Sequence, residues 1–361
     1  MHASHSSIVL ALAAALAATA CGGTPKARVA EPPPSPSATP SATATPTASP
    51  TATPTAPPAP TKPAPILTDE RTVALGFTAA QIVPAGPVVY VVGGDSGHVT
   101  VARIDVATKT VTAQRKFPGE AIRASVGGGT LAILVPGHPA TVSLLNLRTL
   151  AVTATRSLPV AADVLARPEA VYVSTPGQIV ALDPATLRVR RTMHVDDYPQ
   201  QQADGASIAA DPRSHVLYAG VPNSGGPRVD VVDLRSGRLL ARQRLDAIAT
   251  VRPQGYGDDS WAVYSTGMMA AIELLTPNGH VRTTLGSIGP NSASIAVTGR
   301  RLWTFSPGFD QEVRCRDLRT GAVEGSAASP VFAMVAAADN THVYLASGDG
   351  LWLFTPGGAC A

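Results

Sequence analysis

The amino-acid sequence predicts an all-β domain, a seven-bladed β-propeller with four-stranded blades. Three observations predict it: a turn motif that recurs about every 42 residues, paired apolar strands before each turn, and few charged residues. The chain has 361 residues, of which 45% are hydrophobic and only 15% are charged. Globular domains average about 25% charged residues. Strands packed between two neighbouring sheets have few positions facing water, so the low charge agrees with this fold.

The recurring turn reads Asp-x-x-Thr or a near variant. Asp or Asn at its first position accepts a hydrogen bond from the backbone two residues on, and Gly or a small polar residue relieves the bend. The copies begin at Asp105, Asn146, Asp183, Asp233, Thr276, Asp317 and Thr355. Their spacings are 41, 37, 50, 43, 41 and 38 residues, near the period of about 42 expected of propeller blades. The motif predicts seven blades, with eight or an imperfect six as alternative counts.

Apolar strands lie upstream of each turn, and their runs of Val, Ile and Leu suit sheets that are covered on both faces. The last copy ends at Leu351–Phe354, with too little chain for a fourth strand. We expect Thr72–Phe77, which precedes the first copy, to fill that place. Such an N-terminal strand closes the ring and removes exposed sheet edges.

Residues 1–20 are predicted to be an export signal. Ile8–Ala20 is a run of thirteen apolar or small residues, too short for a membrane span of about 20 and typical of a secretory signal. The end of this run, Ala18–Gly22, resembles the bacterial lipobox, which implies that Cys21 is lipidated. Two features depart from the lipobox pattern: Ala18 stands where Leu is preferred, and Met1–Ser7 has no Lys or Arg. Cleavage near Ala20 with a free thiol at Cys21 is the alternative.

Residues 21–65 are predicted to be a disordered linker behind the lipidated cysteine. Thr24–Pro65 holds 14 of the chain's 33 prolines, with Ala, Thr and Ser as most of the rest. Such a segment cannot bury enough apolar area to order itself and extends at ~3.1 Å per residue. We therefore expect export, anchoring to the outer face of the cell membrane, and a propeller domain at residues 66–361. Only four of the 28 basic residues are Lys, a usage typical of GC-rich, actinobacterial-looking genomes.

The segment Asp183–Val195 resembles the YVTN-type, quinoprotein-like propeller repeat, in which an Asp-x-x-Thr turn leads into a strand of alternating Val. The other repeats resemble it more loosely, and together they cover residues 66–361. Some quinoprotein-like propellers bind pyrroloquinoline quinone with a stacking Trp and acidic calcium ligands. Here two of Trp261, Trp303 and Trp352 occupy equivalent second-strand positions, which indicates core packing. We predict no cofactor, with Ca²⁺ as the alternative.

The sequence shows no catalytic constellation. Gly94–Gly97 matches the nucleophile motif of chymotrypsin-like proteases, but the only upstream histidines, His2 and His5, lie in the signal. We interpret this motif as a hairpin turn between two blade strands. The other histidines are spread about one to a blade: His98, His138, His194, His215, His280 and His342.

A binding rim is predicted on one face of the domain. The longest spacing between turns contains the loop Asp196–Gly205, and propeller topology places the hairpin Val221–Pro227 on the same face. Because loops on rigid scaffolds carry function, we group them with the loops near residues 256–259 and 309–311. The acidic pairs could bind Ca²⁺ if they converge, and a tolerated surface insertion is the alternative. The candidate rim residues are Asp196, Asp197, Tyr198, Asn223, Tyr256, Asp258, Asp259, Phe309 and Asp310.

Cys315 and Cys360 are the two remaining thiols, in a chain predicted to be exported, where disulfides form. A bridge between adjacent blades would fix the C-terminus at the point of ring closure. Two unpaired cysteines are the alternative.

The net charge of +3 is dispersed, which argues against nucleic-acid binding, since that needs a basic stripe or cluster. The sequence therefore favours a monomeric, lipid-anchored, non-enzymatic module that binds a protein, peptide or glycan through its loop face. The alternatives are an extracytoplasmic, Ca²⁺-dependent hydrolase or lactonase-like enzyme, and a spacer or assembly scaffold without a small ligand.

Overall fold

The structure is a computed structural model that describes residues 65–95, 97–195, 206–210, 215–221, 228–244, 251–256, 259–266, 269–275, 280–285, 294–305, 312–329, 331 and 335–361. All of these belong to the unit Pro60–Ala361. The predicted signal, Cys21 and the linker up to residue 64 lie outside the described residues. No helix in the described ranges is long and apolar enough to cross a membrane.

The described chain consists of β-strands and one short 3-10 helix, η1 (Gly358–Cys360). The first half contains β1 (Leu67–Ala74), β2 (Ala79–Ala85), β3 (Val88–Asp95), β4 (His98–Asp105), β5 (Thr110–Pro118), β6 (Arg123–Gly127), β7 (Thr130–Val135), β8 (Ala140–Asn146), β9 (Val152–Leu158), β10 (Asp163–Ala166), β11 (Val171–Thr175), β12 (Gln178–Leu182) and β13 (Val189–His194). The second half contains β14 (Ser207–Ala210), β15 (Val216–Val221), β16 (Arg228–Asp233), β17 (Leu239–Arg244), β18 (Val251–Tyr256), β19 (Asp259–Thr266), β20 (Met269–Leu275), β21 (Val281–Leu285), β22 (Ser294–Thr298), β23 (Arg301–Phe305), β24 (Glu312–Asp317), β25 (Val323–Ala328), β26 (Val335–Ala338), β27 (Val343–Ser347) and β28 (Gly350–Pro356).

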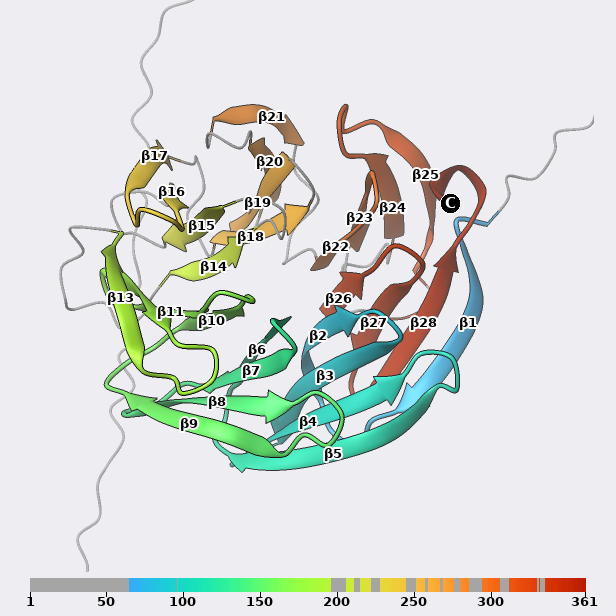
Figure 1. Cartoon of the computed structure of the whole chain (residues 1–361). Helices are drawn as coiled ribbons and strands as arrows, with labels where there is room; N and C mark the ends of the chain where they lie inside the picture. Colours follow the sequence, from blue (N-terminus) through green and yellow to red (C-terminus); the bar gives the residue numbers. More distant parts are fainter. Residues whose placement is uncertain are drawn as a thin grey trace, which may run out of the picture. The chain divides into compact units, whose positions relative to one another are not determined.

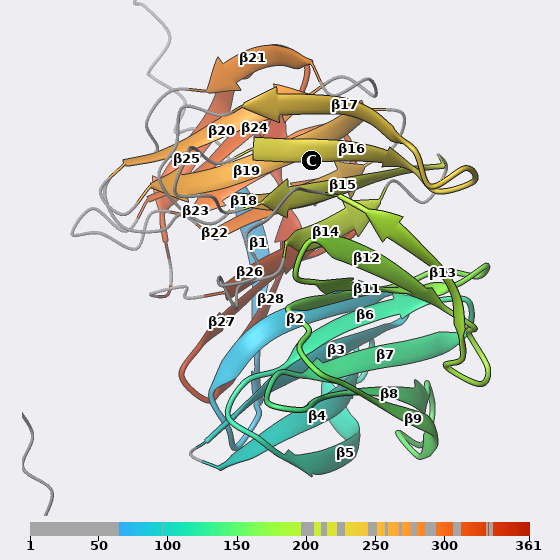
Figure 2. The same cartoon turned by 90° about the vertical axis from the view of Figure 1, so that its left-hand side faces the viewer.

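Hydrogen bonding groups these strands into antiparallel, four-stranded sheets, which establishes the all-β propeller architecture. Consecutive strands form the sheets β2–β5, β6–β9, β10–β13, β14–β17, β18–β21 and β22–β25, and a further sheet has the order β1-β28-β27-β26. The first strand of each consecutive sheet, and β26 in the closing sheet, is innermost, and these strands lie beside one another in the order β22, β26, β2, β6, β10, β14 and β18 (Figure 1). Figure 2 shows how successive sheets stack face to face.

The N-terminal strand completes the last sheet, as the sequence predicts. β1 pairs antiparallel with β28, with Thr72 opposite Trp352 and Val73 opposite Leu351 (Figure 1). The strand begins earlier than predicted, at Leu67, and ends at Ala74. The residues that follow it, Leu75 and Phe77, pack into the core instead. The two ends of the domain are thereby held in one sheet.

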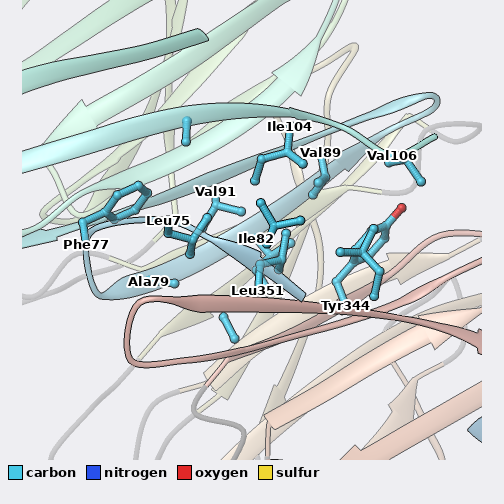
Figure 3. Packing of buried hydrophobic residues seen from close by; sticks show 14 residues of the cluster. Leu75, Phe77, Ala79, Ile82, Val89, Val91, Ile104, Val106, Tyr344 and Leu351 are labelled. Carbon is cyan, nitrogen blue, oxygen red and sulfur yellow. The ribbon is translucent and has the colours of Figure 1, made fainter. Parts of the chain in front are cut away.

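Apolar side chains fill the spaces between neighbouring sheets. The cluster between the β1-β28-β27-β26 sheet and β2–β5 brings Leu351 and Tyr344 against Val89, Val91 and Ile104 (Figure 3). Four other clusters join β2–β5 to β6–β9, β6–β9 to β10–β13, β10–β13 to β14–β17, and β22–β25 to the closing sheet. Trp303 lies fully buried in the last of these, with Nε1 3.0 Å from Thr298 Oγ1.

The predicted count of seven blades needs correction to six. Six sheets are blades with a described core, because the five clusters link them in the series β22–β25, the closing sheet, β2–β5, β6–β9, β10–β13 and β14–β17. The β18–β21 sheet is described through its backbone pairing. The recurring turn marks hairpins, so its copies count sheets, and the described side-chain packing covers six of them. The copy in this sheet, Thr276–Gly279, also lacks the leading Asp and lies outside the described residues.

The recurring turn has one backbone design in five sheets. The fifth residue of the turn donates its N–H to the carbonyl of the first, as from Lys109 to Asp105 at 2.8 Å. That fifth residue has a positive φ, and it is followed by a bulge in the last strand. A turn followed by a left-handed residue and a bulge is a common hairpin closure. The left-handed residues are Lys109, Leu150, Leu187, Gly237 and Gly321.

Candidate binding surfaces

The strand order defines two faces of the domain. The turn face holds the connections between the first and second strands and between the third and fourth strands of a sheet, such as Ala85–Val88 and Asp105–Thr110. The loop face holds the connections between the second and third strands and between successive sheets, such as Asp95–His98 and Pro118–Arg123. The Gly-Asp-Ser-Gly segment is therefore a hairpin on the loop face, with Asp95 opposite His98.

Polar side chains on the innermost strands bind the backbone of the next innermost strand. Gln81 on β2 donates through Nε2 to the carbonyl of Ala124 at 2.8 Å and accepts from its N–H at 2.9 Å. Ser125 on β6 accepts from the N–H of Ala166 at 3.0 Å. Asp163 on β10 accepts from the N–H of Ile208 at 2.8 Å. These side chains join four consecutive innermost strands where no backbone ladder connects them.

The innermost strands otherwise carry mostly small or apolar residues, with Arg123 on β6 and Arg252 and Gln254 on β18 among the exceptions. Across β2, β6, β10, β14, β18, β22 and β26, the one carboxylate is Asp163. No group of three or more His, Cys, Asp or Glu side chains gathers anywhere in the described residues. A central cation site needs several converging oxygen ligands, and the described innermost strands supply one carboxylate.

The turn face is built on a repeated carboxylate cap. In the turn at Asp183, Oδ1 accepts from the N–H of Thr186 at 2.8 Å, from the N–H of Ala185 at 3.0 Å and from the Thr186 hydroxyl at 2.9 Å. These hydrogen bonds, led by the Thr186 N–H, hold the pKa of Asp183 well below its usual range. Hydrogen bonds within the turn likewise lower the pKa values of Asp105, Asp233 and Asp317.

Arginines on the outermost strands reach the turn of the next sheet. Arg115 on β5 donates to the carbonyl of Leu150 at 3.3 Å, and Arg156 on β9 donates to that of Leu187 at 3.1 Å. Arg191 on β13 donates to the carbonyl of Arg235 at 2.6 Å, and Arg282 on β21 donates to that of Leu318 at 3.5 Å. These contacts satisfy carbonyls in the strained turns and link neighbouring sheets at their outer edge.

A buried charged cluster lies between the β10–β13 and β14–β17 sheets. Asp230 is fully buried, and its Oδ1 lies 3.1 Å from Arg228 Nε and 2.9 Å from Arg242 Nε. Arg242 also donates to the carbonyl of Val195 at 3.0 Å, across the sheet boundary. Burial raises the pKa of Asp230, and the two guanidinium groups oppose that rise. Removing one member of such a cluster leaves a buried charge unpaired, which is costly.

Sequence reasoning missed this cluster, although a signal was present. Arg228 and Asp230 alternate with Val229 and Val231 in a strand whose other pleat face is apolar. Charged residues inside an otherwise buried strand require partners, and Arg242 on the neighbouring strand is the partner. The pairing itself depends on strand register, which the repeat spacing does not supply.

The structure places two of the predicted rim residues, Tyr256 and Asp259. Tyr256 ends β18 and lies opposite Asp259, which begins β19, so both belong to a turn-face connection. The connections from β13 to β14 and from β15 to β16 begin and end on the loop face. The expectation that all rim segments share one face is therefore wrong for this hairpin, because it joins a first strand to a second. The remaining rim residues, Asp196, Asp197, Tyr198, Asn223, Asp258, Phe309 and Asp310, lie outside the described residues.

Cys315 and Cys360 form a disulfide across the seam between two sheets. Cys315 lies on β24 and Cys360 in η1, after β28, with a sequence separation of 45 and a Cα–Cα distance of 6.2 Å. Both are buried. Gly325 leaves room for the bridge, because a Cβ there would lie 2.6 Å from Ile66 Cγ2 and 2.9 Å from Cys360 Sγ. The disulfide ties the end of the closing sheet to its neighbour.

The comparisons with known proteins agree on the fold. No protein-family model matches the sequence, and no curated protein sequence matches it. The chain is similar to the crystal structure of BamB from Moraxella catarrhalis, with a TM-score of 0.57 and 15% identity, over 80% of this chain and 100% of that one. It is also similar to the WD40 domain of Toxoplasma gondii coronin, with a TM-score of 0.62 and 9% identity, over 81% of this chain and 87% of that one. The chain is thus a β-propeller protein by its fold.

Proposed function

We propose that this β-propeller is a non-enzymatic binding or scaffold module that recognises a protein partner, or a peptide or glycan. In this proposal the domain acts as a monomer and is held at the outer face of the cell membrane by a lipid on Cys21. The linker at residues 21–65 keeps it away from the bilayer. The domain itself is the YVTN-type propeller that the turn pattern of residues 66–361 suggests.

The observation that carries the proposal is the use of polar side chains in the described sheets. Gln81, Ser125 and Asp163 bind the backbone of adjacent innermost strands. The turn carboxylates, such as Asp183, bind their own turns, and Arg115 and Arg156 bind the next turn. These groups hold the sheets together. A scaffold stiffened in this way presents loops and sheet edges as its variable surfaces, which is how rigid folds carry recognition.

The anchoring part of the proposal rests on the sequence. A short apolar segment ends at Cys21, and a Pro/Thr-rich stretch follows before the first strand at Leu67. Its test is a Cys21→Ser variant of the full chain, expressed in the native cell with an alkyne fatty acid as label. We expect the wild type to take up the label and to sediment with membranes, and the variant to lose both. A variant that stays membrane-bound and is processed at the same residue contradicts lipidation.

The binding part is tested by chemical cross-linking on intact native cells, followed by purification of the full chain. We expect one or more specific proteins to co-purify with it in proportion to its amount. The Cys21→Ser variant is the matched control for proteins captured only through shared membrane. If no protein, peptide or glycan binds while the purified chain binds Ca²⁺ stoichiometrically and hydrolyses esters or lactones, the domain is an enzyme and the proposal is wrong.

A further inference from the structure

One position in the outermost strand can be compared across the sheets. In the six sheets of consecutive strands, the outermost strand begins with a bulge, and one residue of each bulge has no partner in the strand register. In five sheets this residue is polar or charged, and in β17 it is Leu240. The residues at this position are Thr112, Thr153, Arg190, Leu240, Arg282 and Glu324.

The polar residues at this position have polar contacts. Thr112 donates to the carbonyl of Arg103 at 3.1 Å, and Thr153 donates to that of Leu144 at 3.2 Å. Arg190 Nη2 lies 2.5 Å from Asp183 Oδ2. Glu324 Oε2 lies 2.8 Å from Arg301 Nε. In five sheets the bulge therefore holds a side chain that is compatible with water and has a polar partner in its own sheet or, for Arg282, in the next one.

Leu240 departs from this rule. It is 54% exposed, the highest fraction among the exposed large hydrophobic residues of the described chain. Its neighbour Leu239 is 40% exposed, but that position is also apolar and exposed in other sheets, as Val111 (38%) and Val189 (47%). Only the second leucine is peculiar to β17. An apolar side chain at a position that the fold fills with polar groups elsewhere points to a contact made outside the domain.

The surroundings of Leu240 are basic. β17 and the turn before it carry Arg235, Arg238, Arg242 and Arg244, and the one carboxylate in this stretch, Asp233, accepts hydrogen bonds from its own turn. Arg238, Arg242 and Arg244 are all exposed, and Arg242 is bound to Asp230 while the other two are available to a partner. β17 is also the last strand of its sheet, so its outer edge has no strand partner in the described chain.

We propose that an extended acidic segment of a protein partner docks along the edge of β17. An apolar side chain of that segment covers Leu240, and its carboxylates pair with Arg238 and Arg244. The segment adds to the sheet edge beyond the bulge, along Ala241–Arg244, in the manner of strand addition. This inference rests on the proposed binding function and specifies the chemistry of the partner. Charge complementarity is what selects an acidic segment.

The first experiment locates the partner on the surface. A photo-crosslinking amino acid is placed at residue 240 of the full chain in the native cell, and at residue 112 as the matched bulge position of another sheet. We expect a cross-link from residue 240, absent from residue 112, to a peptide rich in Asp and Glu. A cross-link to a second copy of this chain, or none above the residue 112 control, overturns the proposal. If partners co-purify but residue 240 cross-links to none of them, the proposed function stands and only this docking site is wrong.

The second experiment measures the contact with a synthetic peptide of the cross-linked sequence. Leu240→Thr gives β17 the residue that β5 and β9 use, so we expect an unchanged thermal midpoint and at least a tenfold higher Kd. Arg238→Glu combined with Arg244→Glu should raise the Kd to a similar extent, and 300 mM salt should weaken wild-type binding relative to 50 mM. Val111→Thr, an exposed apolar residue on β5, is the control and should bind normally. Equal affinities for wild type and Leu240→Thr overturn the proposal.

Discussion

Gln81 and Ala124 are joined by two hydrogen bonds across the boundary between two sheets, with donor–acceptor distances of 2.8 and 2.9 Å. One side-chain amide satisfies both backbone groups of Ala124, as an adjacent strand would. The innermost strands of a propeller converge without forming a common ladder, so their backbone groups need other partners. The side-chain amide of glutamine carries both an N–H donor and a carbonyl acceptor, so it can bind the carbonyl and the N–H of one residue at once.

Gln81→Leu should therefore destabilise the domain. The leucine has a similar size but leaves the N–H and the carbonyl of Ala124 without this partner, at about 1–3 kcal/mol of unfolding free energy. Urea unfolding followed by circular dichroism measures the difference. Gln114→Leu, at an exposed position of the outermost strand β5, is the control and should change the unfolding free energy little. A loss of equal size in both variants would show that the amide pair has no special role.

The left-handed turn residues give a second prediction, in which one substitution has opposite effects at two sites. Lys109 and Leu187 both have positive φ, at 58° and 56°, a conformation that costs a side-chain-bearing residue about 1–2 kcal/mol. Lys109 is only partly buried, so Lys109→Gly should raise the unfolding free energy, by up to about 1 kcal/mol because glycine also loses more backbone entropy. Leu187 is fully buried, so Leu187→Gly should lower it by about 3 kcal/mol through the lost packing.

Chemical denaturation of the two variants under identical conditions tests this pair. Gly237, which occupies the equivalent position in the next turn with φ of 73°, shows that the backbone accepts glycine there. If Lys109→Gly is destabilising, the turn conformation is not strained, and if Leu187→Gly is not destabilising, the packing of Leu187 does not support the turn.

The turn carboxylates predict how stability responds to acid. Asp105 and Asp317 have lowered pKa values, because the N–H and hydroxyl groups of Thr108 and Thr320 bind their charged forms. A carboxyl whose pKa is lower in the folded than in the unfolded chain stabilises the fold above the unfolded pKa of about 4. That stability is lost as the pH falls through the folded pKa. The unfolding free energy should therefore decrease steadily below about pH 4.

Asn146 supplies the matched control, since it caps the same turn with an amide that does not titrate, accepting from Arg148 and Thr149. The double variant Asp105→Asn and Asp317→Asn should keep the turns and show a shallower loss of stability between pH 5 and pH 2 than the wild type. The measurement is urea unfolding at half-unit steps of pH. Parallel curves for the two proteins would mean that these caps contribute nothing to the acid response.

The sequence predicts the fold far better than the site. The turn residues repeat because each hairpin needs a side chain that accepts hydrogen bonds from the backbone N–H groups of its turn. Asp183 and its equivalents therefore mark the hairpins, and so the sheets, at regular spacing. Ring closure also follows from the sequence. The last copy of the repeat has three strands of its own, β26 to β28, and the segment before β2 supplies the fourth. Packing between sheets depends on side chains far apart in the chain, and so the number of packed blades does not follow from turn spacing.

The features that bear on recognition depend on register, which local patterns do not encode. Tyr256 and Asp259 flank the turn between the first and second strands of their sheet. Successive turns alternate between the two faces, so assigning this turn to the next pair of strands places it on the wrong face. Leu240 is unremarkable in the sequence, next to another leucine. In the strand register Val231 of β16 pairs with Ala241 and Val232 pairs with Leu239, so the bulge leaves Leu240 without an opposite residue. This is what makes Leu240 comparable with Thr112 and Arg190.

The disulfide between Cys315 and Cys360 gives the last prediction, which concerns the closing seam. It closes a loop with a sequence separation of 45 residues, for which the chain-entropy account gives a stabilisation of about 4 kcal/mol. The full chain with Cys315→Ala and Cys360→Ala should lose an amount of this order in chemical denaturation. Reductant should destabilise the wild type to the same level and leave the double variant unchanged. Alkylation followed by peptide mapping should label both cysteines only after reduction. Wild-type protein that labels at Cys315 without reductant, or that unfolds identically with and without it, would mean that packing between β22–β25 and the closing sheet holds the seam without covalent help.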